Sequence, residues 1–345
     1  MIRRDIGSFF VWVRSSQIPI YATPLYIIAG IFILGYKPHL HIYVMSFAVR
    51  LFYVGVMWGQ VPGWSGAMPH KAISSLVASA EILAALMVLI DPWFIDLRGL
   101  SWQIPLWIGS VAHALQYFPR GLGRTMRTAP NILTVVGLLY SLTTPWTNYM
   151  GILVFPLASV LSLLLRVDPT KRKIKITVNH VLIFTLLFII SIVVPITTSS
   201  KEVYRLYLLP LTLLFFFLPK VGGGDIYMVG TSISKIIGLL SFPLSFIFSW
   251  SVSLHIALIG FLAITMASLC TPLLIPGIIW REIPKLSSLE IYFIVSLGLL
   301  STLLRGLGGY IHSIPIVMLS GLLIVVLTLY YVYRILREPR VSVVI

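Results

Sequence analysis

The sequence predicts an all-α, polytopic integral membrane protein: a bundle of about 12 transmembrane helices with both termini on the inner side. Three observations lead to this fold class. Of the 345 residues, 58% are hydrophobic and only 10% are charged, and the mean hydropathy is +0.99. Apolar stretches of spanning length recur along the chain, and lysine and arginine are unevenly divided between the loops that join them.

A helix needs about 20 apolar residues to cross roughly 30 Å of hydrocarbon. In chain order, the stretches that meet this requirement between polar breaks are approximately 17–36, 42–61, 72–90, 100–118, 131–146, 149–167, 179–197, 203–219, 226–246, 253–275, 289–304 and 312–333. No loop between them is long enough for a soluble domain. We therefore expect a single transmembrane domain over 1–345, with an inner-face N-terminal segment (1–16), a helix bundle (17–333) and an inner-face basic tail (334–345).

The distribution of basic residues predicts the orientation of these spans. With the N-terminus inside, eighteen of the 25 lysines and arginines fall in inner segments, and only Lys37, Arg98, Lys201, Arg205 and Arg305 fall in outer ones. Short loops rich in lysine and arginine stay on the cytoplasmic side. The net charge of +15 is thus explained by orientation in a cell membrane and by anionic lipid headgroups. Nucleic acid is not an expected partner, because no soluble basic domain is available to hold it.

Two charged residues fall near the middle of predicted spans. Arg50 lies in the second span and Glu81 in the third. Consecutive spans usually pack as neighbours, and an isolated charge at this depth costs about 2.5–3.5 kcal/mol on insertion scales. We expect an ion pair between them, which is either structural or part of a proton or quinone pathway.

The topology also sorts the histidines by membrane face. His39, His41, His255 and His312 fall on the outer side, and His70, His113 and His180 toward the inner side. Neutral imidazole ligates haem iron, and a b-type haem takes one or two histidines at matching depth. After His113, the segment 113–131 contains Arg120 and Arg124, which suit haem propionates or an anionic headgroup.

In length, span number, basicity and span-edge residues such as His70, His113 and His255, the chain resembles the hydrophobic membrane subunits of archaeal cytochrome b respiratory complexes. The resemblance implies a membrane-integral electron-transport protein that anchors or exchanges electrons with an outward-facing cytochrome. Haem b and quinone are the implied cofactors, and the haem is held either by this chain or by its partner.

A second pattern supports a different function. Asp168 ends the sixth predicted span before the basic run 171–175, and the glycine-rich sequence VGGGD places Asp225 before the ninth. This resembles intramembrane GxGD aspartyl peptidases of the prepilin-peptidase type, in which two carboxyl groups share the acid and base roles. The other interpretation is that Asp225 caps a helix. A secondary transporter is a further alternative, since it fits an even number of spans with both ends inside.

Overall fold

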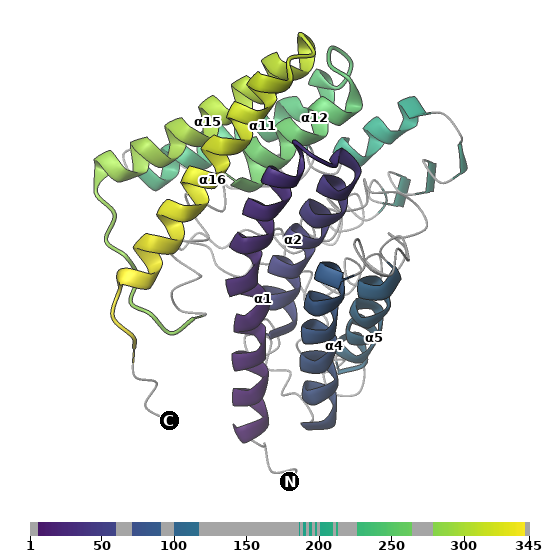
Figure 1. The fold of residues 1–345 in the computed structure, drawn as a ribbon, viewed down its shortest axis with the longest axis vertical. Helices are drawn as coiled ribbons and strands as arrows, with labels where there is room; N and C mark the ends of the chain where they lie inside the picture. Colours follow the sequence, from purple (N-terminus) through teal and green to yellow (C-terminus); the bar gives the residue numbers. More distant parts are fainter. Residues whose placement is uncertain are drawn as a thin grey trace. The chain divides into compact units, whose positions relative to one another are not determined.

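The computed structural model describes residues 6–59, 71–90, 100–116, 186, 189–190, 193–194, 197–198, 201–209, 212, 226–263 and 279–341. Within these residues the secondary structure is helical, and the one piece of extended pairing is an isolated bridge between Arg281 and Arg340. The chain divides into two compact units, Met1–Pro169 and Thr170–Ile345 (Figure 1).

Four helices make up the described part of the first unit: α1 (Ile6–Ile33), α2 (Pro38–Gly59), α4 (Lys71–Ile90) and α5 (Leu100–Gln116). A turn at 34–37 reverses the chain, so α1 and α2 pack side by side in opposite directions (Figure 1). Glycines permit this close approach at both ends. A Cβ added to Gly55 would lie 2.9 Å from the carbonyl oxygen of Ser16, and one added to Gly30 would lie 2.7 Å from Sδ of Met45.

In the second unit the described helices are η4 (Lys201–Leu208), α11 (Ile226–Leu244), α12 (Trp250–Ile256), η5 (Ala257–Ala263), α15 (Ser288–Tyr310) and α16 (Ile314–Arg337). Of these, η4 is a 3-10 helix and η5 a π-helix that continues α12. Glycines again mark the packing contacts: Gly260 of η5 faces Ile237 of α11, and Gly309 of α15 faces Val252 of α12. Small residues at helix contacts are typical of bundles in lipid.

The last two long helices, α15 and α16, form an antiparallel hairpin (Figure 1). At its centre, Ser301 and Ser320 are both buried, and each hydroxyl donates a 2.9 Å hydrogen bond to the other residue's backbone carbonyl. The connecting turn is short, and His312 adopts a left-handed conformation there, with a φ of 54°. Ser313 N–H bonds to the carbonyl of Gly308, which closes the end of α15.

Three described helices are long and apolar enough to cross a membrane: Arg14–Ile33, Ser288–Tyr310 and Ile314–Arg337. Their outward faces suit lipid, since Leu25 of α1 is 69% exposed and Leu303 of α15 is 61% exposed. The structure thus confirms a mostly helical protein with three described helices that are long and apolar enough to span a membrane. The number of spans and the side on which the termini lie stay predictions.

Helix positions agree well with several predicted spans. The prediction 72–90 corresponds to Lys71–Ile90, 100–118 to Leu100–Gln116, and 226–246 to Ile226–Leu244. The first helix begins at Ile6, and its candidate span, Arg14–Ile33, corresponds to the prediction 17–36. That residues 1–16 lie at the inner face stays a prediction. The predicted span at 203–219 differs, since it starts within the short 3-10 helix. The predicted spans 131–146 and 149–167 lie outside the described residues.

Candidate functional site

Helix α4 exposes large apolar side chains and buries its one acidic side chain, the reverse of the arrangement in a water-soluble helix. Ile82, Leu83 and Leu86 are exposed on its outer face, while Glu81 lies on its inner face. The inner face follows the helical period: Val77, Ala84 and Glu81 are three or four residues apart, and all three are buried. Small alanine side chains let the neighbouring helices come close. The only carboxylate of α4 is therefore directed into the helical bundle.

The carboxyl group of Glu81 is the most unusual feature of this unit. The residue is only 1% exposed, and neither carboxylate oxygen has a hydrogen-bond partner among the described residues. Buried polar groups are almost always hydrogen-bonded, and an ionised carboxylate in a low-dielectric interior is strongly disfavoured unless it is paired. Such a group requires a proton, a cation or a polar ligand. A buried ionisable residue of this kind in an apolar helix is a candidate for function.

Neighbouring helices hold α4 in place close to this carboxyl. The hydroxyl of Tyr26 on α1 donates a 2.6 Å hydrogen bond to the backbone carbonyl of Ala85, one turn beyond Glu81. Tyr26 also packs edge to face on Phe47 of α2, which in turn packs edge to face on Trp102 of α5. Phe47 and Trp102 are fully buried. This row of aromatic rings joins α1, α2 and α5, and the hydrogen bond from Tyr26 attaches α4 to it.

Two atoms of α5 share the property that marks Glu81. The side-chain oxygen of Gln103 and the hydroxyl of Ser101 are buried, and both lack a hydrogen-bond partner within the described residues. The described contacts of the unit therefore leave buried side-chain oxygens of three residues, Ser101, Gln103 and Glu81, without a hydrogen bond. Water or a bound polar group commonly satisfies such atoms.

The predicted partner of Glu81 is on a neighbouring helix. Arg50 belongs to α2, and α2 contacts α4. The side chain of Arg50 lies outside the described residues, so the ion pair stays a prediction. The structure does place the two helices as neighbours, which that prediction requires.

Three of the predicted histidine sites can be located. His41 lies at the start of α2, and its Nδ1 is 2.7 Å from the carbonyl oxygen of Gly30 on α1. His255 lies at the end of α12, and its Nδ1 is 2.7 Å from the carbonyl oxygen of Ser251 one turn earlier. His312 is exposed in the turn between α15 and α16. His41 belongs to the first unit and the other two to the second.

The remaining predicted site residues are outside the described part, wholly or by their side chains. His39 and His113 belong to α2 and α5, but nothing of their side chains is described. The residues that lie outside altogether are His70, Arg120, Arg124, Asp168 and Asp225. The haem, headgroup and peptidase predictions that depend on them stay predictions. In the described part of the chain, no group of three or more His, Cys, Asp or Glu side chains is arranged to hold a metal ion.

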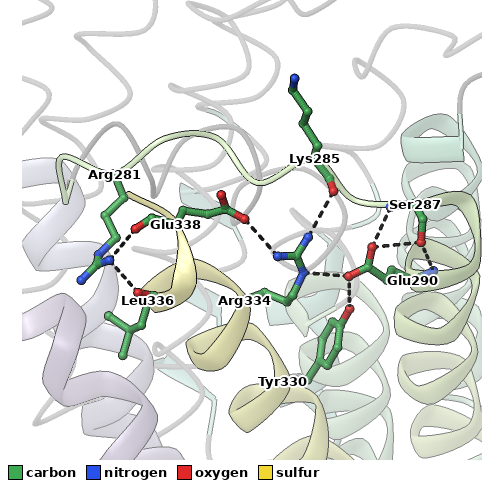
Figure 2. A network of polar contacts seen from close by, with 8 residues as sticks. All are labelled: Arg281, Lys285, Ser287, Glu290, Tyr330, Arg334, Leu336 and Glu338. Carbon is green, nitrogen blue, oxygen red and sulfur yellow. Dashed lines mark hydrogen bonds and ion pairs between the residues drawn. The ribbon is translucent and has the colours of Figure 1, made fainter. Parts of the chain in front are cut away.

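A polar network without an obvious sequence signature closes the open end of the α15–α16 hairpin (Figure 2). Arg334 of α16 donates through Nε to Glu290 Oε1 at 2.7 Å and through Nη1 to Glu338 Oε1 at 2.9 Å. Its Nη2 reaches the carbonyl of Lys285, and Tyr330 donates to Glu290 Oε1 at 2.6 Å. Glu290 is thereby held between the two helices.

Part of this network has a local signal. Ser287 and Glu290 form a capping box at the start of α15, in which Ser287 N–H and Oγ donate to Glu290 Oε2 and Ser287 Oγ accepts from Glu290 N–H. The spacing S-x-x-E before an apolar run indicates such a cap. The contacts with Tyr330 and Arg334 are 40 and 44 residues away in sequence, and no local pattern indicates them.

Comparisons of the chain with protein families, curated proteins and solved structures found no match. The function is therefore inferred from the residues and contacts described above.

Proposed function

We propose that the chain is a multi-pass protein of the cell membrane in which Glu81 takes up and releases a proton within the bilayer, and that it serves as the membrane subunit of an electron-transport complex. One observation carries the proton part of this proposal: the buried carboxyl of Glu81 has no hydrogen-bond partner among the described residues. A carboxyl group in such a place is suited to hold a proton.

The neighbouring helix suggests how the proton is released. In the proposal, Glu81 is neutral when it is alone in the bundle, because an uncompensated negative charge is costly there. The approach of a positive charge within about 4–6 Å favours the ionised form. Arg50 on α2 is the residue that we assign to this role. In the proposal, Glu81 gives its proton to a passing acceptor, and the ion pair with Arg50 then stabilises the carboxylate, so that both the protonated and the ionised form can exist at this site.

The electron-transport part rests on the histidines and on the resemblance described above. Histidines that ligate a metal commonly donate the other ring N–H to a backbone carbonyl, which orients the ring. His41 and His255 both place Nδ1 at 2.7 Å from a carbonyl oxygen. In the proposal these residues, with His312 and His39 on the outer side and His70 and His113 on the inner side, are the candidates for contacts with haem b. A quinone is the second cofactor that we propose.

Infrared difference spectroscopy tests the proton site directly. We expect the purified protein to show the carbonyl band of a protonated carboxylic acid, shifted in D₂O, and the Glu81→Gln variant to lose it. Glu290→Gln is the matched control, since the carboxylate of Glu290 accepts hydrogen bonds from Arg334 and Tyr330 and is held as an anion. A band that survives in Glu81→Gln, or disappears in Glu290→Gln, contradicts the assignment.

A separate measurement tests electron transport. The visible spectrum of the purified complex, oxidised minus reduced, should show a haem signal, and extraction should yield haem or quinone. If purification yields no haem, no quinone and no oxidoreductase partner, this part of the proposal is wrong.

The carboxyl of Glu81 also favours a second candidate function, a proton-coupled secondary transporter. Carboxylates that bind protons inside the bilayer are found in pumps and transporters alike. Solute counter-flow in liposomes that is lost with Glu81→Gln, in a preparation free of redox cofactors, would favour the transporter.

A further inference from the structure

The loop that precedes α15 and the tail that follows α16 pair with each other. Glu282 N–H bonds to the carbonyl of Pro339 at 3.0 Å, and Val341 N–H bonds to the carbonyl of Trp280 at 2.9 Å. These two bonds flank Arg281 and Arg340, which face each other in an isolated antiparallel bridge. The two arginines are therefore a non-hydrogen-bonded pair, the arrangement in which opposite side chains come closest, with Cβ atoms about 4.5–5.5 Å apart.

Two like charges directly opposite each other are destabilising in such a pair. The nearby carboxylates do not relieve this repulsion. The carboxylate of Glu338 is bonded to Arg334. Glu282 directly follows Arg281, and consecutive side chains of extended backbone lie on opposite faces, so Glu282 lies on the face opposite to Arg281. In the described part of the chain neither Arg281 nor Arg340 has an ion pair. Within the described residues, the backbone pairing thus places two arginines opposite each other with no carboxylate bonded to either.

A third arginine joins them at the end of α16. Nη1 of Arg281 donates to the carbonyl oxygens of Leu336 and Glu338, at 2.6 and 2.5 Å. Figure 2 shows the guanidinium of Arg281 bonded to Leu336 and Glu338, which are the residues before and after Arg337 in the chain. Arg337 and Arg340 are exposed. We call Arg281, Arg337 and Arg340 the arginine cluster.

Exposed apolar side chains surround the arginine cluster. Ile283 is 54% exposed, and Leu336 and Val341 are also exposed. Arg337 is the last residue of Ile314–Arg337, Arg340 follows it by three residues, and Arg281 precedes Ser288–Tyr310 by seven. Both helices are long and apolar enough to cross a membrane. In a bilayer that these two helices cross, residues at such helix ends lie where lipid phosphates meet acyl chains. A free phosphate ion gains nothing from apolar neighbours, whereas a lipid uses both kinds of contact.

We propose that the arginine cluster binds the phosphate of an anionic phospholipid, whose acyl chains lie on the exposed apolar residues beside it. Arg281 is a positioning residue, since it also caps α16, and Arg337 and Arg340 supply the free guanidinium groups. Guanidinium groups suit this ligand because they hold phosphate oxygens in a bidentate fork. The inference rests on the membrane position of the hairpin and is independent of the Glu81 proposal.

Native mass spectrometry of the full chain, released from nanodiscs of phosphatidylcholine with a minor fraction of phosphatidylglycerol, tests this site. We expect retained phosphatidylglycerol on the wild type, and a loss of about fivefold for each charge removed in Arg337→Gln and Arg340→Gln. Arg340→Lys keeps the charge but loses the bidentate fork, so its binding should lie between that of the wild type and that of Arg340→Gln. Glu282→Gln is the control of opposite sign on the same segment, and it should bind at least as well as the wild type.

Three results would overturn the proposal: equal retention of phosphatidylglycerol by the wild type and the Arg337→Gln/Arg340→Gln double variant, retention of phosphatidylcholine to the same degree, or displacement of the lipid by inorganic phosphate at similar concentration. The melting temperature and the size-exclusion profile of each variant are measured in parallel. Loss of lipid is attributed to the cluster only in variants with an unchanged melting temperature. The Glu81→Gln variant should bind the lipid as the wild type does, which separates this test from that of the proton site.

Discussion

His312 occupies a backbone position at which glycine is the least strained residue. Its φ of 54° follows the last turn of α15, where the chain must reverse within three residues. For residues with a Cβ, the left-handed conformation costs roughly 1–2 kcal/mol, and histidine is among those that tolerate it best. The presence of histidine at this position fits a role beyond the turn itself.

Replacement of His312 therefore separates its structural role from its functional one. We expect His312→Gly to leave the free energy of unfolding unchanged or to raise it by up to about 1 kcal/mol, because it relieves the strain. Thermal unfolding in detergent provides the measurement. Ser313→Gly is the control, since Ser313 has a φ of −95° and gains nothing from glycine. A lower stability for His312→Gly than for Ser313→Gly would contradict this explanation, and loss of a haem signal at unchanged stability would support ligation by His312.

The serine pair within the hairpin allows the hydrogen bonding between α15 and α16 to be tested. The hydroxyl groups of Ser301 and Ser320 each donate to the other residue's backbone carbonyl, and the two hydroxyl oxygens are 3.2 Å apart. Hydrogen bonds between membrane helices average about 0.6 kcal/mol. We expect Ser301→Ala and Ser320→Ala each to lower the free energy of unfolding by about that amount, with a positive coupling in the double-mutant cycle.

Thr328 offers a matched control for this cycle. Its hydroxyl donates to the carbonyl of Ile324 within the same helix, so Thr328→Val removes a hydroxyl without removing a bond between helices. Strict additivity of the two serine substitutions would show that the bonds do not act as a pair.

At the scale of helices, close packing through glycine can be tested at two contrasting positions. A Cβ at Gly55 would lie 2.9 Å from a backbone oxygen of α1, which cannot move aside easily. A Cβ at Gly306 would meet only Ile256, at an ordinary 3.6 Å. We expect Gly55→Ala to lower stability by about 1–3 kcal/mol through overpacking, and Gly306→Ala to be neutral or stabilising. Chemical denaturation in mixed micelles measures both, and a similar loss in the two variants would show that overpacking at Gly55 is not the cause.

The helices also show what can be predicted from the sequence and what cannot. Hydropathy depends on residue type alone, so the predicted limits of α4, α5 and α11 agree with the structure to within two residues. Helix α1 begins at Ile6, before the predicted span 17–36, because Arg14 limits an apolar stretch without ending a helix: arginine is a good helix former. The 3-10 helix at Lys201–Leu208 and the π-helix after His255 depend on backbone hydrogen bonds that have no simple sequence pattern.

The candidate site is only partly predictable for a related reason. A glutamate in the middle of an apolar stretch can be recognised from sequence, and Glu81 is such a residue. That its carboxyl lacks a partner among the described residues follows from three-dimensional packing. The contacts of Glu290 with Tyr330 and Arg334 and the pairing of Arg281 with Arg340 bring together residues 40 or more positions apart, which loop charges alone do not reveal.

At the scale of the whole molecule, the division into two units leads to a further prediction. Met1–Pro169 and Thr170–Ile345 each have their own helix contacts. We expect each half, expressed separately and purified in detergent, to be helical by circular dichroism and to melt cooperatively, because most packing lies within the halves. The intact chain serves as the reference. A half that lacks a cooperative transition, or that aggregates unless the other is present, would show that the units do not fold independently.

The turn between α15 and α16 has a practical consequence for work on the protein in sealed vesicles. A protease binds its substrate as an extended, flexible segment, and such segments are usually loop tips. Here only residues 311–313 join the two helices, and the N–H groups of Ile311 and Ser313 are already bonded to α15. We therefore expect this end of the hairpin to resist digestion from whichever side it faces. A cysteine introduced at exposed His312 and probed with an impermeant maleimide would report its side without cutting the chain.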